Sequence, residues 1–187
     1  MIQPSPVVST LLFLFATGLA VDADAQPNLL ANGDFETLTD GKPADWPMPA
    51  GATLETEGAN HFLRLHPTSP NQTINVYRDV PVAGVSALQL SYKVRYSEVK
   101  RGTQAWFDAR IIFDFKDAAG AVVKPGPGHP FFTGSSAGWV EKTIRFNVPS
   151  GATVFSMMPA MFQVESGTLD VDDLKLVAIN AADVPAK

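Results

Sequence analysis

The sequence predicts an all-β protein, folded as an antiparallel β-sandwich of the jelly-roll type. Three observations lead to this prediction: segments in which apolar and polar residues alternate with period two, glycine and proline at short intervals between those segments, and no amphipathic helical stripe after residue 25. The chain has 187 residues and is 45% hydrophobic, which suits a single globular domain with an ordinary core.

Residues 1–25 are predicted to be a secretory signal peptide rather than part of the fold. Residues 7–20 form an apolar run, and Ala23-Asp-Ala25 supplies the small-residue pattern of a cleavage site. A membrane-spanning helix needs roughly 20 apolar residues, and this run is shorter. We therefore expect cleavage after Ala25 and a secreted or periplasmic protein. An uncleaved membrane anchor is the alternative.

The two clearest strands are predicted at Leu88–Tyr96 and Trp106–Phe115, because both segments alternate strictly between apolar and polar positions. Burying the apolar face of each strand leaves the polar face outside. The positions expected to be buried are Leu88, Leu90, Tyr92, Val94 and Tyr96 in the first strand and Phe107, Ala109, Ile111, Phe113 and Phe115 in the second.

Weaker alternation predicts five further strands, and turn residues separate them. Residues 124–138, rich in glycine and proline, are expected to form one long irregular insertion. The domain is predicted to occupy residues 26–180, with a flexible tail at 181–187. The five weaker strands are His61–His66, Thr73–Val80, Trp139–Val148, Thr153–Met158 and Thr168–Ile179.

The composition excludes several classes of function. A formal net charge of −5 with scattered basic residues provides no electrostatic footprint for nucleic acid. The absence of cysteine excludes a disulfide scaffold, thiolate zinc sites and a cysteine nucleophile. We expect a monomer that binds neither nucleic acid nor, once the signal peptide is removed, a membrane.

Three motifs resemble a known family. They are Asn28-Leu-Leu-Ala-Asn-Gly-Asp-Phe-Glu36, then Gly41-Lys-Pro-Ala-Asp-Trp46, and Gly167-Thr-Leu-Asp-Val-Asp-Asp-Leu-Lys-Leu176 near the other end. Together they resemble the carbohydrate-binding modules attached to many secreted xylanases and cellulases. The resemblance implies a galactose-binding-domain-like jelly roll that binds a polysaccharide or oligosaccharide without catalysis.

The resemblance also implies a structural Ca²⁺ ion where the first and last strands meet. Carried over by motif, Glu36 and Asp172 would be its side-chain ligands, with Asp34 and Asp173 as further candidates. Calcium takes six to eight oxygen ligands and favours carboxylates supported by carbonyl groups. The alternative is that Asp172 and Asp173 are ordinary carboxylates of an exposed turn.

The polar faces of the two clearest strands are the predicted binding surface for a sugar. Trp106, Asp108 and Arg110 are expected to point outward from the second strand, and Lys93 and Arg95 from the first. If the two strands lie in one sheet, these side chains share a surface. An aromatic ring beside polar groups suits the apolar face and the hydroxyls of a sugar. The alternative is a solvated face with one tryptophan covering the edge of the core.

The other two tryptophans have a structural interpretation. Trp46 and Trp139 each stand where a loop enters a strand, and we expect them to cap the core of the sandwich.

An enzyme on the same fold is the main competing hypothesis. Asp108 and Asp114 would lie about 20 Å apart along one strand, whereas the paired carboxylates of glycosidases lie about 5–9.5 Å apart. Pairs across strands, such as Asp108 with Glu141 or Glu165, remain open. We therefore favour a secreted non-catalytic module. A polysaccharide hydrolase or lyase and a cell-surface protein-interaction module are the alternatives.

Overall fold

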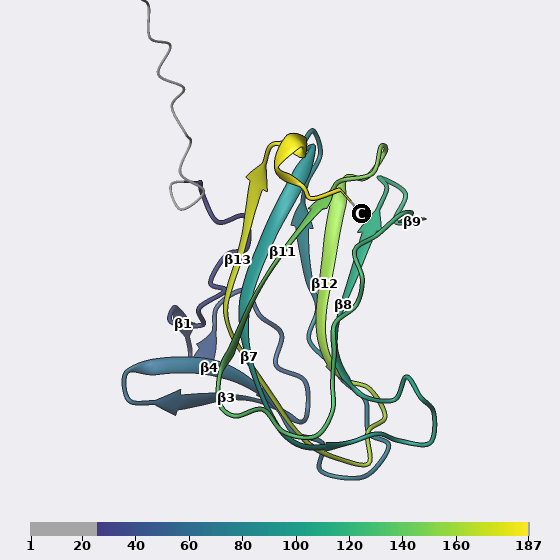
Figure 1. Cartoon of the computed structure of the whole chain (residues 1–187). Helices are drawn as coiled ribbons and strands as arrows, with labels where there is room; N and C mark the ends of the chain where they lie inside the picture. Colours follow the sequence, from purple (N-terminus) through teal and green to yellow (C-terminus); the bar gives the residue numbers. More distant parts are fainter. Residues whose placement is uncertain (1–25, 187) are drawn as a thin grey trace, which may run out of the picture.

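The computed structural model describes residues 26–186, so the predicted signal peptide lies outside the described residues. The predicted all-β sandwich is confirmed: two antiparallel sheets pack face to face, with β13, β7 and β11 in one layer and β12 and β8 in the other (Figure 1). No helix within residues 26–186 is long and apolar enough to cross a bilayer.

One layer is a five-stranded sheet in which the two longest strands, β7 and β13, lie side by side. Strand β13 pairs with β7 along most of its length, with a register shift between Asp172 and Lys175. In spatial order the strands are β11 (Val140–Asn147), β7 (Ala87–Lys100), β13 (Ser166–Ile179), β4 (Asn60–Leu65) and β3 (Ala52–Glu57).

The other layer is a six-stranded sheet centred on the pairing of β8 with β12. Its main path is β10 (Phe131–Phe132), β8 (Ala109–Lys116), β12 (Val154–Met161) and β5 (Ile74–Asn75). Two short strands complete it: β6 (Arg78–Pro81) pairs with β12, and β9 (Val122–Val123) pairs with β8. Outside both sheets, β1 (Leu38–Thr39) and β2 (Lys42–Pro43) form a ribbon, and Ala181–Asp183 form a single 3₁₀ turn within the predicted tail.

The core fills the space between the sheets with the apolar face of each strand. Phe113 and Phe115 of β8 are completely buried and contact Phe155 of β12. Each large apolar side chain buried in this way stabilises the fold by about 1.5–3 kcal/mol. The predicted alternation is confirmed along β7 from Leu88 to Val94, and along β8 from Ala109 onward, whereas Tyr96 of β7 is only partly buried.

The strand predicted from Trp106 begins three residues later, at Ala109. Residues 102–107 form a turn instead, in which the Gly102 amide donates to the Phe107 carbonyl at 2.9 Å. A Cβ atom on Gly102 would lie 2.0 Å from the Gln163 carbonyl oxygen, so only glycine fits this position. This turn carries the chain from one sheet to the other and removes Phe107 from the inward-facing row.

Several other expectations differ from the structure. The predicted strand Thr73–Val80 is divided into β5 and β6, and β3 was not predicted. Residues 124–138 contain β10 and are therefore not wholly irregular. Trp139 does not cap the core: it lies on the outer side of the five-stranded sheet, with its ring 5.3 Å from that of Phe62.

The first two motifs pack together beside β13 and hold the beginning of the chain against its end. The Asn32 side chain donates to the Thr37 and Ala44 carbonyls, and the Trp46 indole donates to the Asn32 carbonyl at 2.8 Å. Trp46 is 5% exposed, so its predicted place at the core is confirmed. The Leu29 amide donates to the Leu176 carbonyl of β13 at 2.7 Å.

Candidate functional site

The structure places the predicted sugar-binding residues on opposite sides of the molecule. Lys93 and Arg95 belong to β7 in the five-stranded sheet, whereas Arg110 belongs to β8 in the six-stranded sheet. Both sets face outward, and the core lies between them. The condition that the two strands share a sheet is therefore not met, and the two groups cannot contact one ligand side by side.

Asp108, expected on the surface, is buried immediately before β8. Its side chain is 2% exposed and accepts a hydrogen bond from Arg110 Nε at 2.6 Å. Arg101 Nε lies 3.9 Å from the other carboxylate oxygen. Because an unpaired buried charge is costly, these two guanidinium groups explain why a carboxylate is tolerated here. Two cations around one anion leave a local excess of positive charge.

An exposed aromatic residue, Phe131 of β10, lies directly beside this charged group. Phe131 is opposite Arg110 in the β10–β8 register, and it is 57% exposed. The Arg101 guanidinium carbon lies 5.3 Å from the centre of the Phe131 ring. Trp106, in the preceding turn, is 55% exposed. We call Arg101, Asp108, Arg110 and Phe131 the Asp108 cluster; Trp106 lies two residues before Asp108 in the chain, with its ring against Phe107.

The Asp108 cluster borders the outer face of the six-stranded sheet. The strand registers place Phe131, Arg110, Ala160 and Asn75 in one row across β10, β8, β12 and β5. Directly opposite residues of an antiparallel pair project from the same face of a sheet, so this row faces outward with Arg110. Ala160, in the middle of this row, is completely buried, so the exposed part of the row lies at its Phe131 end.

Tyr77 adds a further exposed ring, between β5 and β6. It is 53% exposed and follows the buried Val76, so alternation directs its side chain outward. Within residues 26–186 the side-chain oxygen of Asn75 is buried and has no hydrogen-bond partner. Farther along the same face, exposed ion pairs such as Lys124 with Asp114, at 3.3 Å, contribute little stability.

Sequence reasoning missed Arg101, Phe131 and Tyr77. Phe131 was not predicted to lie in a strand, because a two-residue strand within a segment rich in glycine and proline shows no alternation. The only available signal was the pair Phe131-Phe132 after a proline. Arg101 lies beyond the end of β7, where no period-two pattern extends. Tyr77 stands at the break between β5 and β6, in a segment expected to be continuous.

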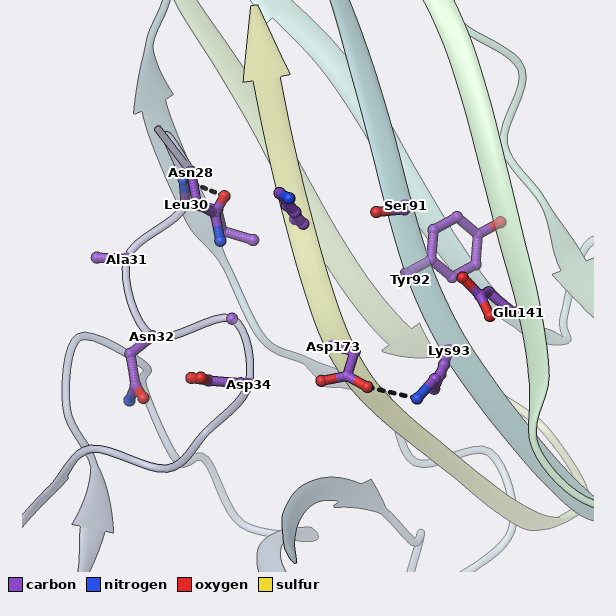
Figure 2. Close-up of a pocket in the computed structure, with 12 residues that line it drawn as sticks. Asn28, Leu30, Ala31, Asn32, Asp34, Ser91, Tyr92, Lys93, Glu141 and Asp173 are labelled. Carbon is purple, nitrogen blue, oxygen red and sulfur yellow. Dashed lines mark hydrogen bonds and ion pairs between the residues drawn. The ribbon is translucent and has the colours of Figure 1, made fainter. Parts of the chain in front are cut away.

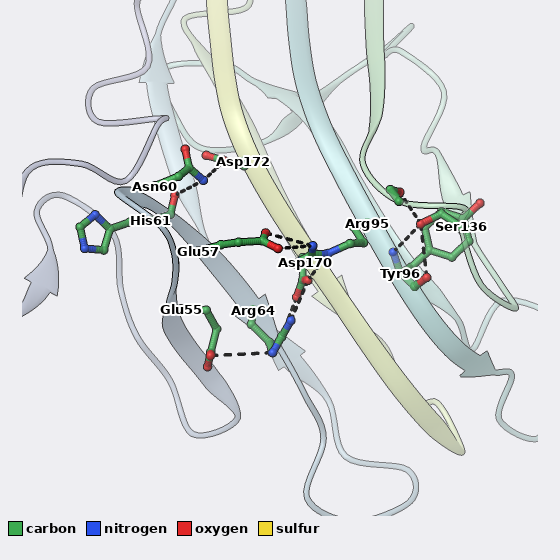
Figure 3. A network of polar contacts seen from close by, with 11 residues as sticks. Glu55, Glu57, Asn60, His61, Arg64, Arg95, Tyr96, Ser136, Asp170 and Asp172 are labelled. Carbon is green, nitrogen blue, oxygen red and sulfur yellow. Dashed lines mark hydrogen bonds and ion pairs between the residues drawn. The ribbon is translucent and has the colours of Figure 1, made fainter.

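The outer face of the five-stranded sheet has a different character, because its charges are matched. Asp170 of β13 accepts hydrogen bonds from Arg64 Nε at 2.7 Å and Arg95 Nε at 2.9 Å (Figure 3). Hydrogen bonding to Asp170 raises the pKa of Arg64. The same two arginines also pair with acidic residues of β3, Arg64 with Glu55 at 3.8 Å and Arg95 with Glu57 at 3.1 Å.

Arg95 is also enclosed by aromatic rings. Its guanidinium carbon lies 5.1 Å from the centre of Phe62 and 4.6 Å from that of Trp139. Cation–π contacts of this kind add to the ion pairs. With its polar edge on Asp170 and its faces on two rings, Arg95 is fixed in place as part of the structure of this sheet.

Lys93 lines a polar pocket of about 600 Å³ between the N-terminal loop, β7 and β13. Asp34 of that loop also lines the pocket, and Figure 2 shows the Asp173 carboxylate of β13 paired with Lys93 Nζ, at 2.7 Å. This hydrogen bond raises the pKa of Lys93. The pocket therefore mixes both signs of charge and has no exposed aromatic ring among its lining residues.

The predicted calcium ligands are distributed over two places. The Glu36 carboxylate accepts a hydrogen bond from the His61 amide and lies 2.7 Å from His61 Nδ1, and Asp172 accepts one from Asn60. These two carboxylates contact consecutive residues of β4, whereas Asp34 lines the polar pocket. Among residues 26–186, no group of three or more acidic, histidine or cysteine side chains is arranged to hold a metal ion. The calcium site stays a prediction.

A second concavity, of about 880 Å³, lies between residues 125–130, strand β11 and residues 184–186. Proline and glycine supply much of its wall, together with Tyr92, whose pKa burial raises to about 12. None of the described aromatic side chains with high exposure lines it.

Known proteins resemble this chain in structure and not in sequence. No family model and no curated protein sequence matches it. A family 61 carbohydrate-binding module, solved in complex with β-1,4-galactotriose, superimposes with a TM-score of 0.55 and 12% identity, covering 82% of this chain and 99% of the module. A family 16 module has a TM-score of 0.52 and 21% identity, covering 80% of this chain and 99% of that one.

The chain has the fold of a carbohydrate-binding module. The same fold matches part of a larger protein, the enzymatically active domain of tailspike protein 4 from bacteriophage CBA120, with a TM-score of 0.59 and 13% identity. That match covers 81% of this chain and 21% of the tailspike chain. At these identities the likeness establishes the fold alone.

Within this carbohydrate-binding-module fold, Asp108 and Glu165 each pair with a basic side chain, and Asp108 and Glu141 belong to different layers. Asp108 immediately precedes β8 of the six-stranded sheet, whereas Glu141 lies on β11, an edge strand of the other sheet. Glu165 instead approaches Lys100, with 3.8 Å between the carboxylate and the ammonium group. Asp108 is itself occupied by the guanidinium of Arg110.

Proposed function

We propose that this protein is an exported, non-catalytic carbohydrate-binding module, and that the outer face of its six-stranded sheet binds a polysaccharide or oligosaccharide. The observation that carries the proposal is the position of the exposed Phe131 ring, which lies opposite Arg110 in the neighbouring strand. Asp108 in turn holds the Arg110 side chain by an ion pair. The predicted signal peptide supports export, and the fold supports a carbohydrate ligand.

The chemistry of this face suits a sugar. Phe131, Tyr77 and Trp106 offer aromatic surface to the apolar faces of sugar rings, and they are exposed before any ligand arrives. Arg110 offers a planar set of donors to hydroxyl groups. Because Asp108 already holds Arg110 Nε, little conformational entropy is lost when the guanidinium contacts a ligand.

A structural calcium belongs to the proposal as a separate part. In such a site Glu36 and Asp172 would supply carboxylate oxygens, and Glu36 would exchange its contact with His61 for the ion. Burial raises the pKa of Asp172, and a cation beside it would offset this effect. Its role would be to join the N-terminal loop to β13, away from the sugar.

Affinity electrophoresis through gels containing different polysaccharides tests the proposed function. We expect the protein to be retarded by at least one glycan, and we expect Phe131→Ala and Tyr77→Ala to reduce the retardation without changing migration in a gel that lacks glycan. Leu38→Ala is the control, because Leu38 is also exposed, at 41%, but lies on the β1–β2 ribbon. Retardation by no glycan in a broad panel, or equal retardation of Phe131→Ala and the parent, would contradict the proposal.

A further inference from the structure

The charge balance of the Asp108 cluster suggests which kind of glycan the proposed site selects. Arg101 and Arg110 share the single carboxylate of Asp108, so the cluster carries a net positive charge. The whole chain has a net charge of −5, so this excess is local. It stands directly beside the exposed ring of Phe131.

The opposite face shows what a purely structural arginine arrangement looks like in this protein. There, Arg64 and Arg95 are matched by Asp170, Glu55 and Glu57, so the anions outnumber the cations. Two aromatic rings also enclose Arg95. At the Asp108 cluster, by contrast, the aromatic ring is exposed and the charge is not fully matched.

Both arginines of the cluster have donors left for a ligand. Asp108 accepts from Nε of Arg110, and the terminal amino groups of Arg110 make no hydrogen bond within residues 26–186. The Arg101 side chain is 43% exposed, and its only ion-pair partner in the described part of the chain is Asp108, at 3.9 Å. A guanidinium fork recognises a carboxylate through paired, charge-assisted hydrogen bonds, which are stronger than those to neutral hydroxyls.

We infer that the ligand of this site is an acidic glycan, a polysaccharide containing uronic acid residues. The apolar face of a sugar ring would stack on Phe131 while its carboxylate accepts hydrogen bonds from Arg101 and Arg110. This inference rests on the proposed function and adds the class of sugar to it. It explains why two arginines, rather than neutral amide donors, adjoin the aromatic surface.

The test compares one polysaccharide before and after its charge is removed. Binding of the purified protein to polygalacturonate and to the same polymer with its carboxyl groups chemically reduced is measured at two salt concentrations. We expect the acidic polymer to bind at least about tenfold more tightly, the equivalent of one charge-assisted hydrogen bond. We also expect its binding to weaken with added salt, because exposed charges are screened.

Three variants connect the preference to the cluster. Arg101→Gln is the main one, because Arg101 is exposed enough to be replaced without unfolding the protein, and it is expected to lose most of the preference. Arg110→Lys keeps the charge but loses the planar fork, so it is expected to weaken the preference less. Arg145→Gln is the matched control: it removes one positive charge from β11, where Arg145 bonds Gln89, and is expected to bind as the parent does.

The outcomes separate the inference from the proposed function. Equal binding of the acidic and reduced polymers, or retention of neutral glycans only, would overturn the inference and leave the proposed function standing. An unchanged preference in Arg101→Gln, or an equal loss in Arg145→Gln, would also overturn it, because the charge effect would then not belong to this cluster. Failure to bind any glycan would overturn the proposed function and the inference together.

Discussion

Phe131 and Phe132 are neighbours in β10 whose side chains point to opposite sides of the six-stranded sheet, and replacing each by alanine separates binding from stability. Phe131 is 57% exposed, and truncating it is expected to change the free energy of unfolding by less than about 0.5 kcal/mol. Phe132 is 7% exposed and its ring lies 5.3 Å from that of Tyr96.

Replacing Phe132 by alanine is expected to lower the free energy of unfolding by about 3 kcal/mol. This is the lower end of the range for a buried phenylalanine, because a two-residue edge strand relaxes around the cavity. For a domain of this size, 1 kcal/mol corresponds to about 2–4 °C in melting temperature, so Phe132→Ala should melt about 6–12 °C below the parent. Thermal melts beside affinity electrophoresis measure both properties. The reasoning is refuted if Phe131→Ala destabilises as much as Phe132→Ala, or if Phe131→Ala is retarded like the parent.

Three further predictions concern other parts of the account. Millimolar calcium is expected to raise the melting temperature of chelator-treated protein, since an ion that binds only the folded state stabilises it, and equal melting with and without calcium would exclude the site. Hydrogen bonding from His61 lowers the pKa of Glu36 below its ordinary 4.5, so this carboxylate stabilises the fold above pH 4.5, and that stability is lost as the pH falls through the lowered pKa. The Glu36→Gln variant should therefore lose less stability than the parent as the pH is lowered through this range. An unchanged dependence of stability on pH would contradict the contact. No reducing ends or unsaturated products are expected from xylan, glucan, mannan or alginate, and product that scales with protein concentration would point to an enzyme.

The architecture could be predicted because the long strands carry their own signal. In β7 and in β8 from Ala109, strict alternation separates core positions from outer positions, and burying the apolar set is far less costly than burying the charged one. Turn residues separate the remaining strands. The short strands β5, β6, β9 and β10 have too few residues to show any period, so their pairing depends on the neighbouring strands.

The site was harder to predict, because it depends on which strands share a sheet. Alternation indicated correctly that Arg95 and Arg110 face outward, but it says nothing about the crossing between β7 and β8 that puts them on opposite faces. Asp108 lies between the turn at Gly102 and the first residue of β8, where the period-two pattern continues by coincidence beyond the true start of the strand and does not predict burial. The alternation of apolar and polar residues predicts which side chains of a strand face outward. The connections between strands determine which of these outward-facing side chains lie on the same sheet.

Mapping the ligand contact on the protein tests the proposed binding face most directly. An NMR titration of isotope-labelled protein, with an oligosaccharide cut from whichever polysaccharide retains it, reports on backbone amides throughout the chain. We expect the largest shifts at Tyr77, Arg110 and Phe131, on and beside the outer face of the six-stranded sheet. Shifts concentrated instead at Arg95 and Trp139, on the opposite face, or along residues 125–130 would contradict this expectation.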